Sequence, residues 1–166
     1  ASDVYKRQLL YQIISQRPDY SFVFTGPEDD GFRQHRIHSL KNAYFTGQKK
    51  VDELPAYITA YDVCINPQMV NDITDGNYPL KIDEYLAMGK PTVATSTHTM
   101  RNIFADHTHL ATNLGEWLSA IDRAVTEADD KKLAKQRIAF AETHSWGHSV
   151  KKIYDIIDNF LKEKAT

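Results

Sequence analysis

The sequence predicts an α/β protein with a doubly wound, mainly parallel sheet and helices on both faces. Short runs of aromatic and β-branched residues alternate along the chain with segments whose apolar residues recur at helical spacing. Strands separated by helices are joined by right-handed crossovers, so this order favours a parallel sheet. The 166 residues fit one domain, and no internal repeat, low-complexity tract or linker rich in Pro, Gly or Ser divides them.

The expected strands are short apolar runs that end at turn residues. The first is closed by Gly26-Pro27 and the second by Gly47. In chain order the strands are expected at residues 20–25, 43–46, 62–66 and 92–95, followed by a weaker strand or extended segment at 109–112.

The expected helices follow from apolar spacing and from their end signals. The first covers residues 9–17, because Pro18 cannot continue a helix. Asp52 is a candidate cap for the helix after the second strand. Pro79 suits the first turn of a later helix, and Gly89 suits its end. The remaining helical patterns span 32–40, 114–127, 130–143 and 147–163.

The beginning of the chain does not fit this fold class. Doubly wound sheets normally open with a strand that lies at the centre of the sheet, whereas residues 1–8 contain only Val4 and Tyr5 as strand formers. We therefore expect an atypical segment at 1–8, one domain at 9–166, and a chain that is a fragment lacking its first strand.

That strand would lie between the strands expected at 20–25 and 62–66. Three compensations are open: partial pairing by residues 1–7, closure of the two neighbours on each other, or a strand donated by a second chain. The charged residues Asp3, Lys6 and Arg7 are poor in a buried strand, which slightly favours the second chain and thus a homodimer of the fragment.

Composition and charge exclude several classes of protein. The net charge of −2 gives no basic face for a nucleic acid. The longest apolar run, 138–141, is far shorter than the roughly twenty residues that a membrane span needs. Cys64 is alone, so an internal disulfide and a thiolate zinc site are excluded. No secretory signal opens the sequence, and the cytoplasm is the default compartment.

Residues 62–95 carry the chemical signal. They form the pattern strand, polar loop, helix, glycine, strand, which points a helix N-terminus at the carboxyl edge of the sheet, where phosphate groups bind. Lys81 and Glu84 share a face of that helix. A cation suits a diphosphate, and a carboxylate suits the two hydroxyls of a ribose. The alternative is an exposed ion pair worth less than about 1 kcal/mol, which the spacing alone favours.

The run PLKIDEYLAMGKPTVAT resembles the donor-binding helix and following strand of glycosyltransferase family 4, the B-type class of retaining sugar transferases. The order of the other segments agrees: LLYQIISQRPDYSFVFTGP, then AYFTGQKKVDELPAYITAYDVCINP, then SWGHSVKKIYDII. From Leu9 to Leu161 the chain is similar to the carboxy-terminal, nucleotide-sugar-binding, Rossmann-like domain of that family, particularly of members similar to teichuronic acid biosynthesis transferases.

The resemblance implies a role for each matching residue. Glu84 matches the second glutamate of a pair separated by seven residues, which holds the donor ribose. Pro79 and Leu80 match the turn whose backbone N–H groups meet the diphosphate, and Lys81 faces phosphate. Gly89 and its neighbours 90–91 are packing positions at the helix-to-strand turn.

The sequence also departs from the family pattern. Where the family has a glutamate near the donor sugar, this chain has Gly76, and Asp75 beside it is the candidate replacement. The arginine and lysine that relatives carry after the first strand have no visible counterpart. His98 follows the strand ending at Thr95 and is a further candidate for donor phosphate or sugar, with loop surface as the alternative.

The seven histidines do not predict a metal site. Their pairs have ligand-like spacing but no clear third ligand, and zinc needs three or four; the pairs are 35/38, 107/109 and 144/148. Trp146 suits a helix anchor in the core or at a domain interface. No cofactor is indicated, and no catalytic residue is assigned.

These observations predict the donor-binding half of a glycosyltransferase that uses a UDP- or GDP-sugar and a glycan or lipid-linked acceptor. The acceptor-binding domain is absent from this chain, so we expect the isolated chain to be inactive. The alternative is a non-catalytic nucleotide- or sugar-binding module with a regulatory or interaction role. A peripheral membrane location of the full-length enzyme is left open.

Overall fold

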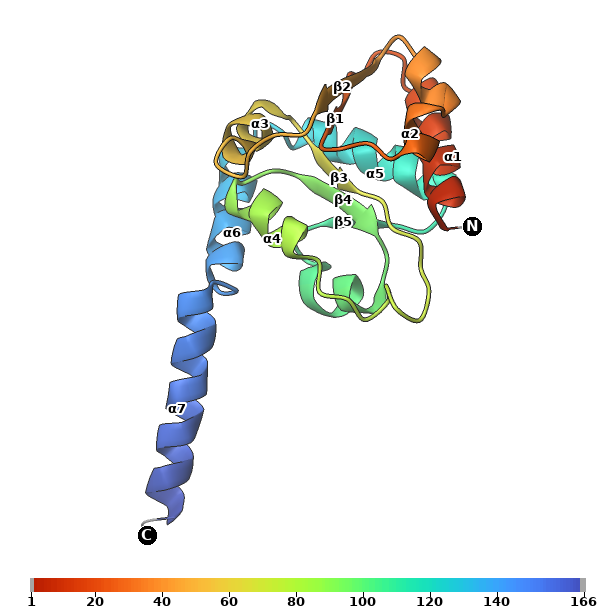
Figure 1. Ribbon diagram of the computed structural model, residues 1–166. Coiled ribbons are helices and arrows are strands. Elements are labelled where there is room, and N and C mark those ends of the chain that lie inside the picture. The colour runs from red at the N-terminus through yellow and green to blue at the C-terminus, as the bar shows by residue number, and fades with distance from the viewer. Residues whose placement is uncertain (1, 165–166) are drawn as a thin grey trace.

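A computed structural model describes residues 2–164 of the chain and confirms the α/β class (Figure 1). Every strand pair in it is parallel. Helices flank the strands, as the sequence predicts for a Rossmann-like fold. The strands are β1 (Phe22–Thr25), β2 (Ala43–Gly47), β3 (Cys64–Asn66), β4 (Thr92–Thr95) and β5 (His109–Ala111).

The α-helices follow the order that the sequence predicts. They differ from the prediction at the start of the first helix, at residues 30–39 and at residues 100–104. The α-helices are α1 (Ser2–Ser15), α2 (Asp30–Arg33), α3 (Leu54–Ala60), α4 (Leu80–Ala87), α5 (Leu114–Thr126), α6 (Lys131–Glu142) and α7 (Trp146–Lys164). A 3-10 helix, η1 (Arg36–Ser39), replaces much of the helix expected at 32–40, and a π-helix, η2 (Met100–Phe104), was not foreseen. The prediction that Asp52 caps a helix is wrong: Glu53 stands at that position of α3, without a side-chain cap hydrogen bond.

The strands form two sheets, β1-β2 and β3-β4-β5. Among residues 2–164, no ladder of hydrogen bonds joins β1 to β3, the two strands between which the first strand was expected. Residues 2–8 belong to α1, so the prediction that this segment pairs partially as a strand is wrong. The expected start of the first helix at residue 9 is also wrong, because α1 begins at Ser2. Closure of β1 on β3 is wrong as well. The strand from a second chain stays a prediction.

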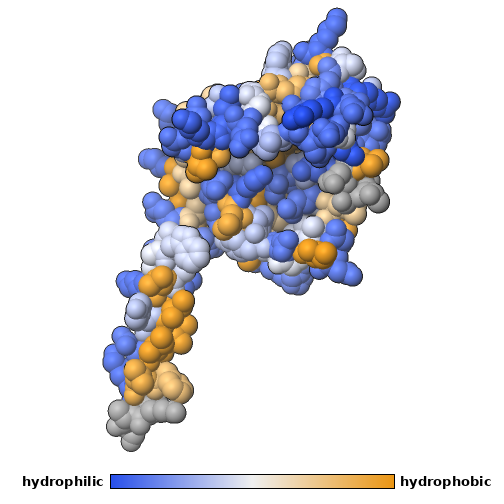
Figure 2. Space-filling model, viewed as in Figure 1, coloured by the Kyte–Doolittle hydropathy of each residue, from blue (hydrophilic) through white to orange (hydrophobic). Residues whose placement is uncertain are grey.

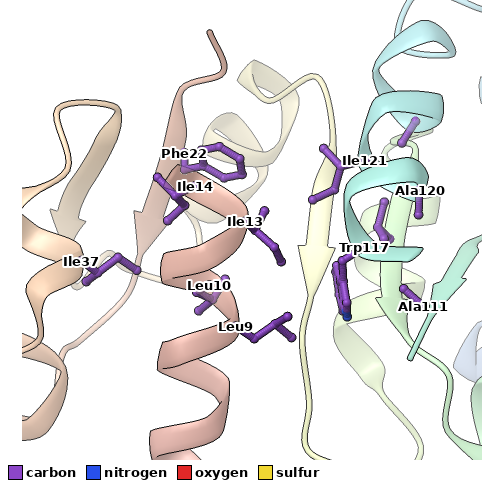
Figure 3. Close-up of a cluster of buried hydrophobic side chains, with 12 residues drawn as sticks. Leu9, Leu10, Ile13, Ile14, Phe22, Ile37, Ala111, Trp117, Ala120 and Ile121 are labelled. Carbon is purple, nitrogen blue, oxygen red and sulfur yellow. The ribbon is translucent and has the colours of Figure 1, made fainter. Parts of the chain in front are cut away.

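One apolar core spans both sheets (Figure 3). Leu9 and Ile13 lie on the side of α1 that faces Trp117 of α5, whereas Ile14 lies beside Phe22 of β1. These side chains are buried, and each contributes roughly 1.5–3 kcal/mol by leaving water. Partly buried residues of β2 and β3, including Phe45 and Ile65, pack on the same cluster.

A second, smaller cluster positions α4. Ile82 and Leu86 of α4 are fully buried with Phe104 of η2, and Phe140 of α6 packs against them. Gly89 ends the helix with a φ of 71°, a conformation that favours glycine. A Cβ there would lie 3.1 Å from the Cβ of Ala134 in α6. The predicted packing role of Gly89 is therefore confirmed.

Helix α7 extends away from the rest of the chain (Figure 1). Its apolar side chains gather in one stripe that is open to solvent (Figure 2). Trp146 at its start is 85% exposed, so the prediction of a core anchor is wrong and the domain-interface interpretation stays a prediction. Within the described residues, neither α7 nor any other helix combines the length and apolarity that crossing a membrane requires.

A polar contact fixes the end of α1 to α5. The guanidinium of Arg17 donates to both carboxylate oxygens of Asp122, at 2.7 and 2.5 Å, and the Tyr20 hydroxyl donates to the same carboxylate at 3.1 Å. The hydrogen bond from Arg17 holds the pKa of Asp122 below its usual range. The side chain of Asp122 is 42% exposed, so water screens the pair.

This contact predicts a pH-dependent loss of stability. The pKa of Asp122 is lower in the folded chain than in the unfolded chain. The ionised carboxylate therefore stabilises the fold at pH values above the unfolded pKa of about 4, and this stabilisation is lost as the pH falls through the pKa of the folded chain. We expect Asp122→Asn to lower the free energy of unfolding by about 1 kcal/mol or less at pH 7. Urea unfolding at pH 7 and near pH 3 checks this, with the exposed Asp62→Asn as control. An equal loss at both pH values would contradict the prediction.

Candidate functional site

The candidate site lies at the carboxyl edge of the β3-β4-β5 sheet. The loop of residues 67–79 leaves β3 here, residues 96–99 leave β4, and α4 begins beside them. The Thr95 hydroxyl joins the first two segments, since it accepts from the N–H of Gln68 at 2.7 Å and donates to the carbonyl of Gln68 at 2.9 Å. The loop of residues 67–79, residues 96–99 and the start of α4 therefore lie at the edge where ligands of open parallel sheets bind.

Asp75 ties the two loops together a second time. Its Oδ1 accepts the backbone N–H of His98 at 2.6 Å, and its carbonyl accepts the N–H of Thr99 at 3.2 Å. The structure therefore brings the predicted residues Asp75 and His98 together, but through the main chain of His98. The ring Nε2 of His98 lies 2.8 Å from Nδ2 of Asn102.

The start of α4 leaves polar groups open to a ligand. Pro79 is the N-cap and offers no side-chain hydrogen bond, while its carbonyl accepts the N–H of Ile82 at 2.8 Å. Leu80 is 65% exposed, and Lys81 and Glu84 are also exposed. A helix start of this kind presents free N–H groups and a positive dipole end.

Lys81 and Glu84 do not pair with each other. Among the ion pairs of residues 2–164, none involves either side chain. The alternative of an exposed intrahelical ion pair is therefore not what the structure contains. Both side chains leave one face of the first turns of α4, where they are accessible to a ligand.

Arg101 is a cation at this edge that the sequence analysis missed. Its Nη1 donates to the carbonyl of Ser96 at 2.7 Å and lies 3.4 Å from the Ser96 hydroxyl, directly after β4. In the sequence, Arg101 lies three residues after His98, and this spacing would place both residues within one helical turn.

Two cavities of the described residues lie away from α4. One, of about 280 Å³, is at the carboxyl end of β1 and is lined by Lys6, Arg7 and Phe32 among others. The side chain of Arg7 there lies 3.4 Å from Asp29. The other, of about 620 Å³, lies between β5 and α5. At α4 itself, the side chains of Leu80, Lys81 and Glu84 are exposed at the sheet edge.

Three histidines are held by separate carboxylates. His38 lies 2.8 Å from Glu28, His109 lies 3.0 Å from Glu127, and His144 lies 2.9 Å from Asp83. Within the part of the chain that the structure describes, no group of three or more His, Cys, Asp or Glu side chains is placed to hold a metal ion.

Comparison with known proteins identifies the family. The family described as "Glycosyl transferases group 1" matches residues 3–134, which includes the strands, α4 and both loops of the candidate site. This chain belongs to the group 1 glycosyl transferases. It is also 26% identical over 146 residues to TuaH of Bacillus subtilis (strain 168), which is named as a teichuronic acid biosynthesis glycosyltransferase.

The match covers 84% of this glycosyltransferase chain but 36% of TuaH. The chain therefore spans about a third of the length of the curated relative that it matches. The predicted resemblance to the glycosyltransferases is confirmed, and the donor, the acceptor and the stereochemistry of transfer are matters of proposal.

The thiol of Cys64 is not a candidate nucleophile. Burial raises the pKa of Cys64 to about 12, and the thiolate is the reactive form. We expect a disulfide reagent such as dithionitrobenzoate to label Cys64 at pH 8 at least about a hundredfold more slowly in the folded chain than in guanidinium chloride. The absorbance of the released product measures this rate, and rapid stoichiometric labelling of the folded chain would contradict the burial of Cys64.

Proposed function

We propose that this chain binds the nucleoside diphosphate of a UDP- or GDP-sugar at the start of α4. The observation that carries this proposal is the uncapped helix start with Lys81 and Glu84 unpaired on one exposed face, at the carboxyl edge of a parallel sheet. Membership of the group 1 glycosyl transferases supports a sugar donor as the ligand. The charge and the hydrogen-bonding groups at this edge supply what a diphosphate and a ribose need.

Each residue then has a distinct task. The backbone N–H groups of the first turn, from Leu80 onward, and the ammonium of Lys81 meet the diphosphate. The carboxylate of Glu84 accepts hydrogen bonds from the two ribose hydroxyls. Asp75 and His98, on the loops after β3 and β4, face the sugar.

The chemistry follows from this arrangement. The full-length protein transfers the sugar with retention to a glycan or lipid-linked acceptor, and the difficult charge is that of the departing diphosphate. The helix dipole, Lys81 and Arg101 stabilise that charge, so the positive end of α4 does the work that a metal ion does in other transferases. The acceptor is held by a part of the protein outside this chain.

The first test measures the affinity for UDP and GDP by calorimetry. We expect Glu84→Ala and Lys81→Ala each to weaken binding roughly tenfold, because each removes a charge-assisted contact worth about 1.5 kcal/mol at a solvent-exposed position. Glu142→Ala and Lys132→Ala, on the exposed surface of α6, serve as controls. Only the Lys81 effect should shrink with added salt. If both site variants bind as tightly as the parent, the proposed site is wrong.

The second test concerns turnover. We expect the 166-residue chain to bind nucleoside diphosphate without transferring sugar, since a site that holds only the donor cannot position an acceptor. Release of nucleoside diphosphate from UDP- and GDP-sugars, with and without glycan acceptors, is the measurement. Sugar transfer by the isolated chain would overturn this prediction. Binding of sugar nucleotides by a full-length protein that transfers nothing would favour the regulatory module instead.

A further inference from the structure

Asp83 makes two hydrogen bonds that join separate segments to α4. Its Oδ2 accepts the hydroxyl proton of Tyr78 at 2.5 Å, and its Oδ1 lies 2.9 Å from Nδ1 of His144. Tyr78 directly precedes the N-cap Pro79, and His144 lies between α6 and α7. An ionised carboxylate only accepts hydrogen bonds, so both partners donate. We call these three residues the Asp83 linkage.

Aromatic side chains pack around the Asp83 linkage, although Tyr78 itself is 42% exposed. The Tyr78 ring packs on Phe104 with ring centroids 5.5 Å apart, and Phe140 meets His144 edge-to-face at 4.5 Å. The side chain of Asp83 is 19% exposed. Burial and the bond to Asp83 raise the pKa of Tyr78 well above its ordinary value, so its hydroxyl stays protonated and keeps donating.

The Asp83 linkage takes the place of a helix cap. An ordinary N-cap side chain accepts the N–H of the second or third helical residue, which removes that group from a ligand. Pro79 offers no such bond. The turn from Tyr78 into α4 is instead fixed by a side-chain bond across five residues, and the first N–H groups remain free for an anion.

The direction of Asp83 also matters. At about 100° per residue, Asp83 lies about 200° around the helix from Lys81 and about 100° from Glu84. Its carboxylate accepts hydrogen bonds from donors that lie away from the face that carries Lys81. The carboxylate therefore holds the helix start and leaves the Lys81 face open to a diphosphate.

We infer that Asp83 is a positioning residue, which holds the first turn of α4 through Tyr78 and His144 in the conformation that presents its N–H groups to the donor diphosphate. This inference rests on the proposed function. It predicts that loss of either hydrogen bond weakens the binding of nucleoside diphosphate, although neither side chain touches the ligand.

The test compares Tyr78→Phe, Asp83→Asn and the double variant with the parent. Tyr78→Phe keeps the ring that packs on Phe104, so the chain should still fold. We expect each single variant to weaken the calorimetric affinity for UDP or GDP about five- to tenfold, and the double variant to be no weaker than the worse single one, because both break one network. Asp72→Asn, an exposed acid of the preceding loop, is the matched control.

Two further measurements separate positioning from general destabilisation. Hydrogen exchange at the N–H of Ile82, which bonds to the Pro79 carbonyl, should become several-fold faster in Tyr78→Phe without any ligand. His144→Asn keeps a donor near the Nδ1 position and should retain the parental affinity, whereas His144→Ala should not.

The outcomes of these measurements distinguish the two claims. If the parent chain binds UDP or GDP and the Tyr78 and Asp83 variants bind equally well, Asp83 has no positioning role and the proposed function stands. If the parent chain binds neither nucleotide, the proposed function is wrong, and the role of Asp83 toward a diphosphate falls with it. Unchanged exchange at Ile82 in both variants would overturn the positioning role by itself.

Discussion

A shared apolar core is the constraint on which the rest of this structure depends. The β1-β2 and β3-β4-β5 sheets are not joined by a ladder within residues 2–164, so apolar packing takes the place of strand pairing between them. Helices α1 and α5 provide it, through Ile13, Ile14 and Trp117 beneath both sheets. Hydrophobic burial is non-directional, so the fit of these side chains sets how the sheets lie. The hydrogen bonds between Arg17 and Asp122 are directional, and they fix the end of α1 against α5.

The position of α4 depends in turn on a buried charge. Arg137 of α6 is 5% exposed, and burial lowers its pKa, yet it is fully paired: its guanidinium bonds Glu127 and lies 3.4 Å from the carbonyl of Gly89. Removing one partner of such a pair leaves an uncompensated charge, which destabilises far more than the pair itself stabilises. The C-terminal end of α4 is thereby fixed to α6, and the Asp83 linkage fixes its other end near the α6–α7 junction.

Sequence reasoning succeeded where local pattern and tertiary packing agree. Strand β4 was predicted at its observed bounds because all its residues are buried, and α4 was found from Pro79 and Gly89. The predicted start of α1 was wrong, because this helix continues from its apolar residues back through polar residues to Ser2. The contact of Asp75 with the main chain of His98 joins residues 23 positions apart in loops without periodicity, so no spacing rule could reveal it. Arg101 was missed because the short helix that carries it, η2, was not predicted.

Three carboxylates within ten residues end up with different tasks, and their hydrogen bonds decide which. Asp75 is engaged by the N–H of His98, and Asp83 by Tyr78 and His144. Glu84 has neither a hydrogen bond nor an ion pair from its side chain within residues 2–164, and it leaves α4 on the same side as Lys81. A carboxylate oxygen that already accepts a hydrogen bond from the fold is less available to a ribose hydroxyl. The fold thus engages one oxygen of Asp75 and both oxygens of Asp83, whereas both oxygens of Glu84 are open to the two ribose hydroxyls of the proposed donor.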